Sequence, residues 1–289
     1  MRNIAIVLGL TAIATSATAA DMPLKAPPRL APSFSWSGCY IGGYIGGAWN
    51  GGDGATFTDQ GQVGNSQSSF LSYSGGVVGA RIVPPHSWSA DLDSSVIGGG
   101  TLGCNWQPVG SSFVLGIEGE AGYMRLTGQA FDPNTIKGEN NTQTTPDVLG
   151  SAKVGDWYGM VTGRLGYAWD RTLIYVKGGA AFVPTRGAVV DACNTEGCGN
   201  WLVSTAGSRT VTTWTLGGGI EWAFAPSWSV KAEYMFIALG DNGGFRTCGT
   251  ATNTQNTAVL GGPFCFDHSF DGIHTAKIGL NYRFGGGRY

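Results

Sequence analysis

The segment GIHTAKIGLNYRF, residues 272–284, changes chemical character at every second position. Successive side chains of a β-strand point to opposite faces, so this alternation predicts a strand with one apolar and one polar face. The apolar set is His274, Ala276, Ile278, Leu280, Tyr282 and Phe284, and the polar set is Thr275, Lys277, Asn281 and Arg283. The segment therefore predicts a long amphipathic strand.

Other segments of similar length are also rich in β-branched, aromatic and glycine residues. They lie near 37–49, 95–105, 112–124, 156–168, 172–184, 211–224 and 227–239. Alternation recurs in 112–124, 156–168, 211–224 and 227–239, but the other three are rich in glycine and leave the facing of their side chains ambiguous. With residues 272–284, these segments predict eight strands.

The connections between these segments alternate in length. Short turns fall at Trp106–Ser111, Trp169–Arg171 and Ala225–Ser227, where Asp170 and Pro226 favour turns. The other connections, about 50–94, 125–155, 185–210 and 240–271, are long, and their Gly, Asn, Thr, Ser and Gln content predicts loops. Short turns at one end and long loops at the other are typical of outer-membrane barrels. We therefore predict an all-β fold, a transmembrane eight-stranded antiparallel up-and-down β-barrel with long extracellular loops.

Two alternatives to this fold stay open from the sequence. The stretch Phe70–Val83 could add strands and make a ten-stranded barrel, although we expect it to pair outside the membrane or to form a loop. A water-soluble β-sandwich also has alternating strands, with its charged residues facing solvent.

Composition and the N-terminus agree with an exported membrane protein. Charged residues make up 12% of the chain, about half the share usual in soluble domains, and 49 of the 289 residues are glycine. Residues 1–20 combine Arg2, a short apolar run and a small-residue end, as in a secretory signal peptide. We expect a proline-rich periplasmic tail over 21–35, the barrel over 36–284 and a C-terminal extension over 285–289. The predicted location is the bacterial outer membrane.

The polar faces of the predicted strands carry equal numbers of acidic and basic residues. Because a buried charge is costly unless it is paired, these side chains are expected to form ion pairs inside a narrow barrel. The predicted lumen network comprises Glu118, Glu120, Arg164, Lys177, Glu221, Lys231, Glu233 and Lys277.

Tryptophans lie near both ends of the predicted strands, where membrane barrels carry interfacial aromatic girdles. The predicted interfacial residues are Trp36, Trp106, Trp169, Trp222 and Trp228 at the periplasmic end, and Trp49, Trp157 and Trp214 at the outer end.

Six cysteines in an exported chain suggest disulfide bonds. Topology pairs Cys39 with Cys104 at the rim of adjacent strands, and places Cys193 with Cys198 and Cys248 with Cys265 in two long loops. A zinc site at Cys265 and His268 would lack further ligands, so we expect no metal.

Several motifs resemble a known family. They are Trp36-Ser-Gly-Cys-Tyr-Ile-Gly-Gly-Tyr-Ile-Gly-Gly47, Gly98-Gly-Gly-Thr-Leu-Gly-Cys-Asn-Trp106, Gly163-Arg-Leu-Gly-Tyr-Ala-Trp169, Tyr175-Val-Lys-Gly-Gly-Ala-Ala181, Lys231-Ala-Glu-Tyr234 and Gly279-Leu-Asn-Tyr-Arg-Phe284. The chain resembles the alphaproteobacterial outer-membrane immunogenic proteins, or porin-family small barrels, with an OmpA-like architecture. This resemblance implies an eight-stranded barrel, outer-membrane location and surface exposure, but no catalytic residues. The aromatic assembly signal could be Phe284 or Tyr289.

The expected function is a structural and surface-interaction role in the cell envelope. A narrow porin-like channel for small solutes and a loop-borne site for haem or another ligand, near Trp88 and Trp201, are the alternatives. An enzyme is not expected, because His86 and His268 lie in predicted loops and Asp267 and Asp271 beside His268 form a weak catalytic grouping. We expect no cofactor. Expected partners are outer-membrane lipid and lipopolysaccharide, the barrel-assembly machinery and extracellular or host ligands, but no nucleic acid, given the net charge of −2.

Overall fold

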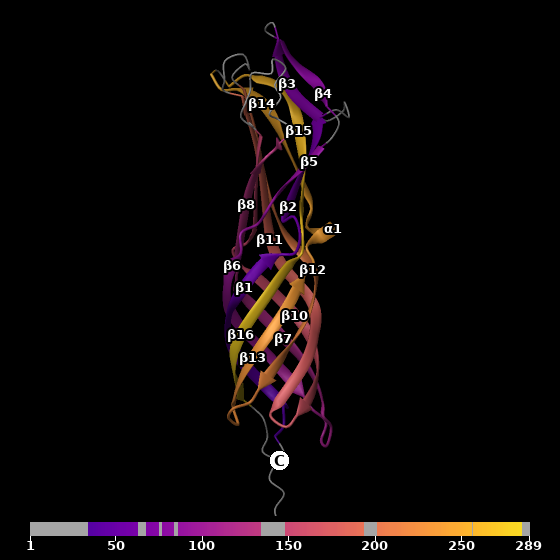
Figure 1. Ribbon diagram of the computed structural model, residues 1–289, viewed down its shortest axis with the longest axis vertical. Coiled ribbons are helices and arrows are strands. Elements are labelled where there is room, and N and C mark those ends of the chain that lie inside the picture. The colour runs from indigo at the N-terminus through magenta and orange to yellow at the C-terminus, as the bar shows by residue number, and fades with distance from the viewer. Residues whose placement is uncertain are drawn as a thin grey trace, which may run out of the picture. The chain divides into compact units, whose positions relative to one another are not determined.

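The computed structural model describes residues 34–62, 68–74, 77–83, 86–133, 148–193, 201–255 and 257–284 (Figure 1). All of them belong to the second of two units, Phe34–Tyr289. The predicted signal peptide, the tail up to residue 33 and the C-terminal residues 285–289, including Tyr289, therefore lie outside the described residues.

Eight antiparallel strands close into a ring, as predicted. The order of the strands around the ring is β1-β6-β7-β10-β11-β12-β13-β16, and each strand pairs with the next. The ring closes because β16 pairs with β1. The strands are β1 (Gly38–Asn50), β6 (Ser95–Trp106), β7 (Phe113–Tyr123), β10 (Tyr158–Trp169), β11 (Thr172–Cys193), β12 (Trp201–Trp222), β13 (Trp228–Ile237) and β16 (Ile273–Phe284).

The ring has the reverse polarity of a water-soluble protein. In β16 the side chains of Ile278, Leu280 and Tyr282 are 62%, 45% and 42% exposed, whereas Lys277 and Asn281 are buried. A soluble sandwich would bury the apolar face and expose the charged one. Apolar residues outside and charged residues inside fit a ring surrounded by lipid, so the sandwich alternative is excluded.

The four long connections are present, but most of their described residues form strands and not the irregular loops that their composition suggested. The upper halves of β11 and β12 continue beyond the ring and pair with β9 and β14. The added strands are β2 (Ala55–Gln62), β5 (His86–Ala90), β8 (Arg125–Phe131), β9 (Val148–Gly155), β14 (Phe245–Asn253) and β15 (Val259–Phe270). We call these strands, together with the upper halves of β11 and β12, the extension.

The extension is a curled sheet whose two edges approach each other. Its strand order is β5-β2-β15-β14-β12-β11-β9-β8. The indole N–H of Trp88 on β5 donates to the Ala130 carbonyl of β8 at 3.3 Å, and beyond the end of β5 the Asp93 N–H donates to the Thr127 carbonyl of β8 at 2.9 Å. The extension therefore resembles a second, nearly closed barrel that shares β11 and β12 with the ring (Figure 1).

Two smaller elements complete the described fold. The stretch Phe70–Val83 adds no strand to the ring, because β3 (Ser68–Ser74) and β4 (Val77–Val83) pair with each other as a separate two-stranded sheet. A single helical turn, α1 (Gly240–Gly243), follows β13. Among the described residues, no helix has the length and apolar character needed to cross a membrane.

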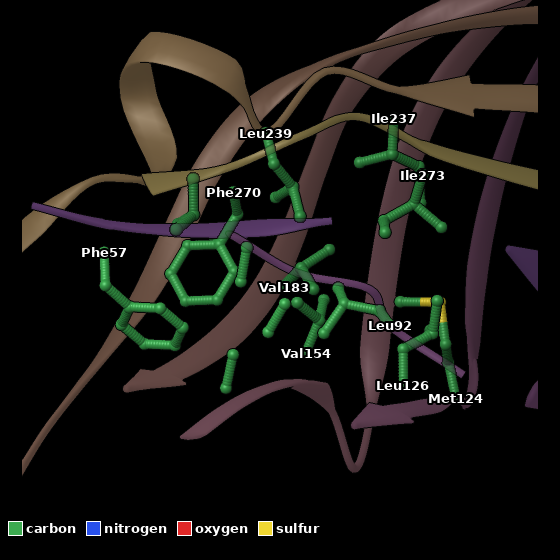
Figure 2. Close-up of a cluster of buried hydrophobic side chains, with 14 of the residues drawn as sticks. Phe57, Leu92, Met124, Leu126, Val154, Val183, Ile237, Leu239, Phe270 and Ile273 are labelled. Carbon is green, nitrogen blue, oxygen red and sulfur yellow. The ribbon is translucent and has the colours of Figure 1, made fainter. Parts of the chain in front are cut away.

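An apolar core fills the extension and reaches into the adjoining end of the ring (Figure 2). Phe57 of β2 stacks on Trp88 of β5 with 5.4 Å between ring centroids. The packing is tight, since a Cβ added to Gly150 of β9 would lie 2.7 Å from the Phe57 ring. The extension is thus held together as a folded body and not as a set of separate loops.

Candidate functional site: the lumen of the ring

Six strands place the eight predicted charged residues on the inner wall of the ring. Each side chain occupies an inward position of its strand and is at most 6% exposed. They are Glu118 and Glu120 on β7, Arg164 on β10, Lys177 on β11, Glu221 on β12, Lys231 and Glu233 on β13, and Lys277 on β16. The structure therefore brings together all eight residues.

Three carboxylates and three ammonium groups form the larger of two charge clusters. Lys177 Nζ lies 2.5 Å from a Glu118 oxygen and 2.7 Å from a Glu233 oxygen. Lys231 contacts Glu118 at 3.1 Å, and Lys277 contacts Glu233 at 3.0 Å. Lys277 also pairs with Glu120. Each carboxylate thus has more than one lysine neighbour, and the charges of the cluster balance.

Arg164 and Glu221 form the second cluster. Their side chains make a direct ion pair, and Glu221 also accepts hydrogen bonds from Ser229 at 2.5 Å and from Asn281 at 2.9 Å. The Arg164 guanidinium lies over the Tyr175 ring, 3.6 Å from its centroid. Such additional partners are what a buried ion pair needs to offset the loss of hydration.

Tyrosines connect these charges, although the alternation of the strands did not predict their role. Tyr40, Tyr158 and Tyr175 donate hydrogen bonds to Glu118, Glu120 and Glu233 at 2.5, 3.0 and 2.8 Å. Tyr44 and Tyr158 are joined through their hydroxyl groups at 2.8 Å.

Inward glycines give these large side chains room. On β6, a Cβ on Gly103 would lie 2.5 Å from the Tyr40 ring, and one on Gly99 would lie 2.3 Å from the Tyr44 hydroxyl. The glycine-rich strands whose facing was ambiguous are therefore strands that make space in the lumen. Glycine opposite an inward tyrosine is the signal that could have identified them.

Trp36 closes the short-turn end of the lumen, and its assignment to the interfacial girdle is wrong. Its side chain is 1% exposed, and its indole N–H donates to the Asp170 carbonyl at 3.3 Å. The Arg283 guanidinium lies 4.6 Å from the Phe34 ring centroid and 4.8 Å from that of Trp36. Trp36 also packs in one apolar cluster with Leu173. The residue precedes β1 and turns inward, so strand periodicity could not predict its direction.

An apolar layer closes the opposite end of the lumen. Figure 2 shows Ile237 of β13 and Ile273 of β16 pointing into this layer from the ring, with Met124, which follows β7, and Leu126 and Leu239 beside them. All five side chains are fully buried. The charge clusters are therefore enclosed between this layer and the Trp36 cluster.

The other predicted interfacial tryptophans point outward. Their exposed fractions range from 38% for Trp49 to 81% for Trp169. The remaining members are Trp106, Trp157, Trp214, Trp222 and Trp228. Phe284, the candidate assembly signal, is 45% exposed at the end of β16.

Two predicted disulfides are present. Cys39 is bonded to Cys104 between β1 and β6, and Cys248 to Cys265 between β14 and β15. The second bond lies in strands and not in a loop. The predicted bond between Cys193 and Cys198 lies outside the described residues.

The weak catalytic grouping predicted near His268 does not form. His268 is buried on the inner face of β15, where its ring bonds to the Thr247 hydroxyl at 2.7 Å, whereas Asp267 points outward and pairs with Arg246. His86 begins β5, and its side chain lies outside the described residues. Trp88 is not a loop residue either, because it is buried in the extension. The Trp201 side chain also lies outside the described residues.

Glu118, Glu120 and Glu233 could in principle surround a cation, since their oxygens lie within 4.8 Å of one another. Lysine ammonium groups already occupy that position, however, and each carboxylate lies within 4 Å of at least two of them. The geometry therefore favours a neutral internal network over a metal site.

Comparison with known proteins gives the family. The outer membrane protein beta-barrel domain family matches residues 5–284. The 31 kDa outer-membrane immunogenic protein of Brucella melitensis is 29% identical over 281 residues, which cover 94% of this chain and 95% of that protein, and the protein of the same name from Brucella suis gives the same values. Among solved structures, the attachment invasion locus protein Ail of Yersinia pestis is 14% identical, with a TM-score of 0.33, over 86% of this chain and 99% of Ail.

The family match covers the whole ring and the extension. The match ends at residue 284, the last residue of β16, and its range includes every strand of the ring. The exposed apolar side chains of the ring and its outward tryptophans fit a surrounding of membrane lipid. The chain therefore belongs to the outer membrane protein beta-barrel domain family and is a β-barrel of the bacterial outer membrane.

Proposed function

We propose that the protein is a closed structural barrel that anchors the extension at the cell surface, where the extension serves surface interactions. The observation that carries the proposal is the enclosed lumen, in which a balanced charge network lies between two apolar layers. On this proposal the barrel contributes to the integrity of the envelope and does not conduct solutes.

The charge network opposes a continuous water path. A permeating ion would have to separate Lys177 from Glu118 and Glu233, or Arg164 from Glu221, while these groups are shielded from water. Leaving one charge of a buried ion pair without its partner costs about 3–5 kcal/mol. The permeating ion would also have to displace Trp36 at the periplasmic end. An eight-stranded barrel is also just wide enough for its side chains to fill.

The extension supports the surface-interaction part of the proposal. Its inner face is packed, and its outer face carries polar side chains such as Gln129, Ser151 and Ser208. A folded polar body beyond the outer girdle can meet extracellular or host ligands in a fixed arrangement. We do not propose a catalytic role, because His268 and Asp267 face opposite sides of β15.

The expected partners fit the same proposal. Outer-membrane lipid would surround the exposed apolar side chains of the ring, and the barrel-assembly machinery would read an aromatic residue at or after the end of β16. Phe284 offers such a residue.

Single-channel recording in planar bilayers tests the closed lumen. The folded protein is expected to give no stable conductance steps, with or without reduction of its disulfides. A wide porin in the same bilayer serves as the positive control, and protease protection verifies that the barrel has inserted. Stable charge-selective steps that change in Lys231→Met or Glu233→Gln would instead establish a water-filled lumen and the channel alternative.

A further inference from the structure

The outer face of the extension contains a groove of about 890 Å³ that the closed-barrel proposal does not use. It crosses β8, β9, β11 and β12, with Asp93 at one edge. The groove lies entirely on described residues and is separate from the lumen, since its β11 and β12 residues lie beyond the parts of those strands that pair with β10 and β13 in the ring.

Strand register arranges the polar residues of the groove in rows. Thr127, Lys153, Arg186 and Ser208 are successive cross-strand neighbours, one from each strand. The next row outward is Gln129, Ser151, Ala188 and Ala206. Directly opposite residues stand about 5 Å apart, so each row is a continuous line of side chains. The small residues of the second row leave the surface hollow.

Two cations lie side by side at the centre of the first row. Lys153 and Arg186 are direct cross-strand partners, an arrangement that is unfavourable for like charges. Asp156 is a shared counter-ion, at 2.5 Å from Lys153 and 3.4 Å from Arg186. One carboxylate therefore serves two cations, and the Arg186 side chain remains 55% exposed. Its remaining guanidinium N–H groups are available to a second anion.

The position of the groove points to the source of that anion. On β12, Ser208 precedes Trp214 by six residues on the side away from the ring, which is roughly 20 Å along a strand at ~3.3 Å per residue. Trp214 is 54% exposed and belongs to the outer aromatic girdle. The groove therefore lies outside the apolar part of the membrane, on the side of the outer leaflet and beyond the level of the outer girdle.

We propose that this groove binds the phosphorylated saccharide head group of an outer-leaflet glycolipid such as lipopolysaccharide. A phosphate accepts hydrogen bonds from Arg186 and Lys153, while Thr127, Gln129, Ser151 and Ser208 pair with sugar hydroxyls. Asp93, at the β8 edge, repels the phosphate and so directs that end of the head group toward Arg186.

Native mass spectrometry of the full protein in detergent tests this site, with titration by a purified rough-type lipopolysaccharide. The double variant Lys153→Gln/Arg186→Gln is expected to bind at least about tenfold more weakly than the wild type. Arg246→Gln is the matched control, because Arg246 is an equally exposed extension arginine that pairs with Asp267 outside the groove. It is expected to bind like the wild type.

Further arms identify the ligand chemistry. Ala206→Trp fills the hollow without changing charge and is expected to weaken binding as well. Dephosphorylated lipopolysaccharide and free inorganic phosphate are both expected to bind much more weakly than the intact glycolipid. Equal binding by the double variant and the wild type, or equal binding of dephosphorylated glycolipid, overturns the proposal. Tighter binding of free phosphate than of glycolipid overturns the membrane source. None of these outcomes depends on whether the lumen conducts.

Discussion

His268 is an ionisable residue inside an apolar core. Its ring stacks on Phe245 with 4.9 Å between centroids and meets Phe57 edge-on. Burial lowers the pKa of His268 to about 4, and the nearby Asp267 carboxylate offsets this only in part. In the unfolded chain an imidazole has a pKa near 6.5. Below that pH the unfolded chain therefore binds a proton that the folded extension excludes.

This difference predicts that the extension loses stability in acid. The stabilising contribution of neutral His268 is complete above about pH 6.5 and falls as the pH drops toward 4, by about 1–2 kcal/mol at pH 5. Hydrogen exchange of β14 and β15 amides at pH 7 and pH 5, corrected for intrinsic rates, measures it. The pH effect should shrink in His268→Asn and persist in His274→Gln. An unchanged pH effect in His268→Asn would assign the acid sensitivity to another group.

Single residues show where sequence periodicity suffices. Lys277 and Glu233 lie within alternating strands, and their neighbours fix the face on which they lie. Trp36 and Trp88 lie outside the predicted strands, where no period orients a side chain. Both are buried by tertiary contacts, to Arg283 and Phe57 respectively, that no local pattern encodes.

At the scale of elements, the long connections are strands because β11 and β12 do not end with the ring. Each continues to 22 residues and offers a paired edge to β9 and β14. Their polar outward residues and glycines suggested loops, but the inward positions contain Val183, Val189, Val203 and Val211, all buried. Those valines at even spacing were the available signal for a continued strand.

The bond between Cys248 and Cys265 joins two strands that lack support from the ring. It encloses a segment with a sequence separation of 17, for which an unfolded-state constraint of about 3 kcal/mol is typical. Cys248→Ser/Cys265→Ser is therefore expected to speed limited proteolysis of β14 and β15 while the ring keeps its heat-modifiable mobility on gels. Cys39→Ser/Cys104→Ser is the matched pair in the ring and should leave extension cleavage unchanged. Equal cleavage of β14 and β15 in both pairs would contradict a local role.

On the scale of the whole molecule, the lumen behaves as one charge-balanced unit built from six strands. Lys177 contacts Glu118, Glu120 and Glu233, so its loss leaves three carboxylates with two lysines. Lys177→Met is expected to lower the free energy of unfolding by about 3–5 kcal/mol. Urea unfolding in detergent, followed by heat-modifiable mobility, measures this loss.

Restoring neutrality supplies the control. Lys177→Met/Glu233→Gln again has equal numbers of positive and negative groups and should recover part of the lost stability, giving a favourable coupling in a double-mutant cycle. Strictly additive losses would mean that the charges act independently.

The sequence predicted the ring well because its whole perimeter is amphipathic, and membrane and lumen impose opposite chemistry on alternate residues. It also predicted the eight charges, since their numbers must balance inside. It did not predict the extension, whose closure depends on pairing between segments far apart in the chain, such as β2 with β15.

The unbroken passage of β11 and β12 from ring to extension has a mechanical consequence. Each strand spans roughly 70 Å at ~3.3 Å per residue, with no loop or glycine linker between its membrane-embedded and external parts. The β11–β12 pair is therefore a stiff support that is anchored in the wall of the barrel. A force on the external part of this pair is transmitted through the hydrogen bonds between the two strands to the barrel wall. The extension is therefore held at a fixed distance from the membrane, with little lateral motion, when a partner binds it.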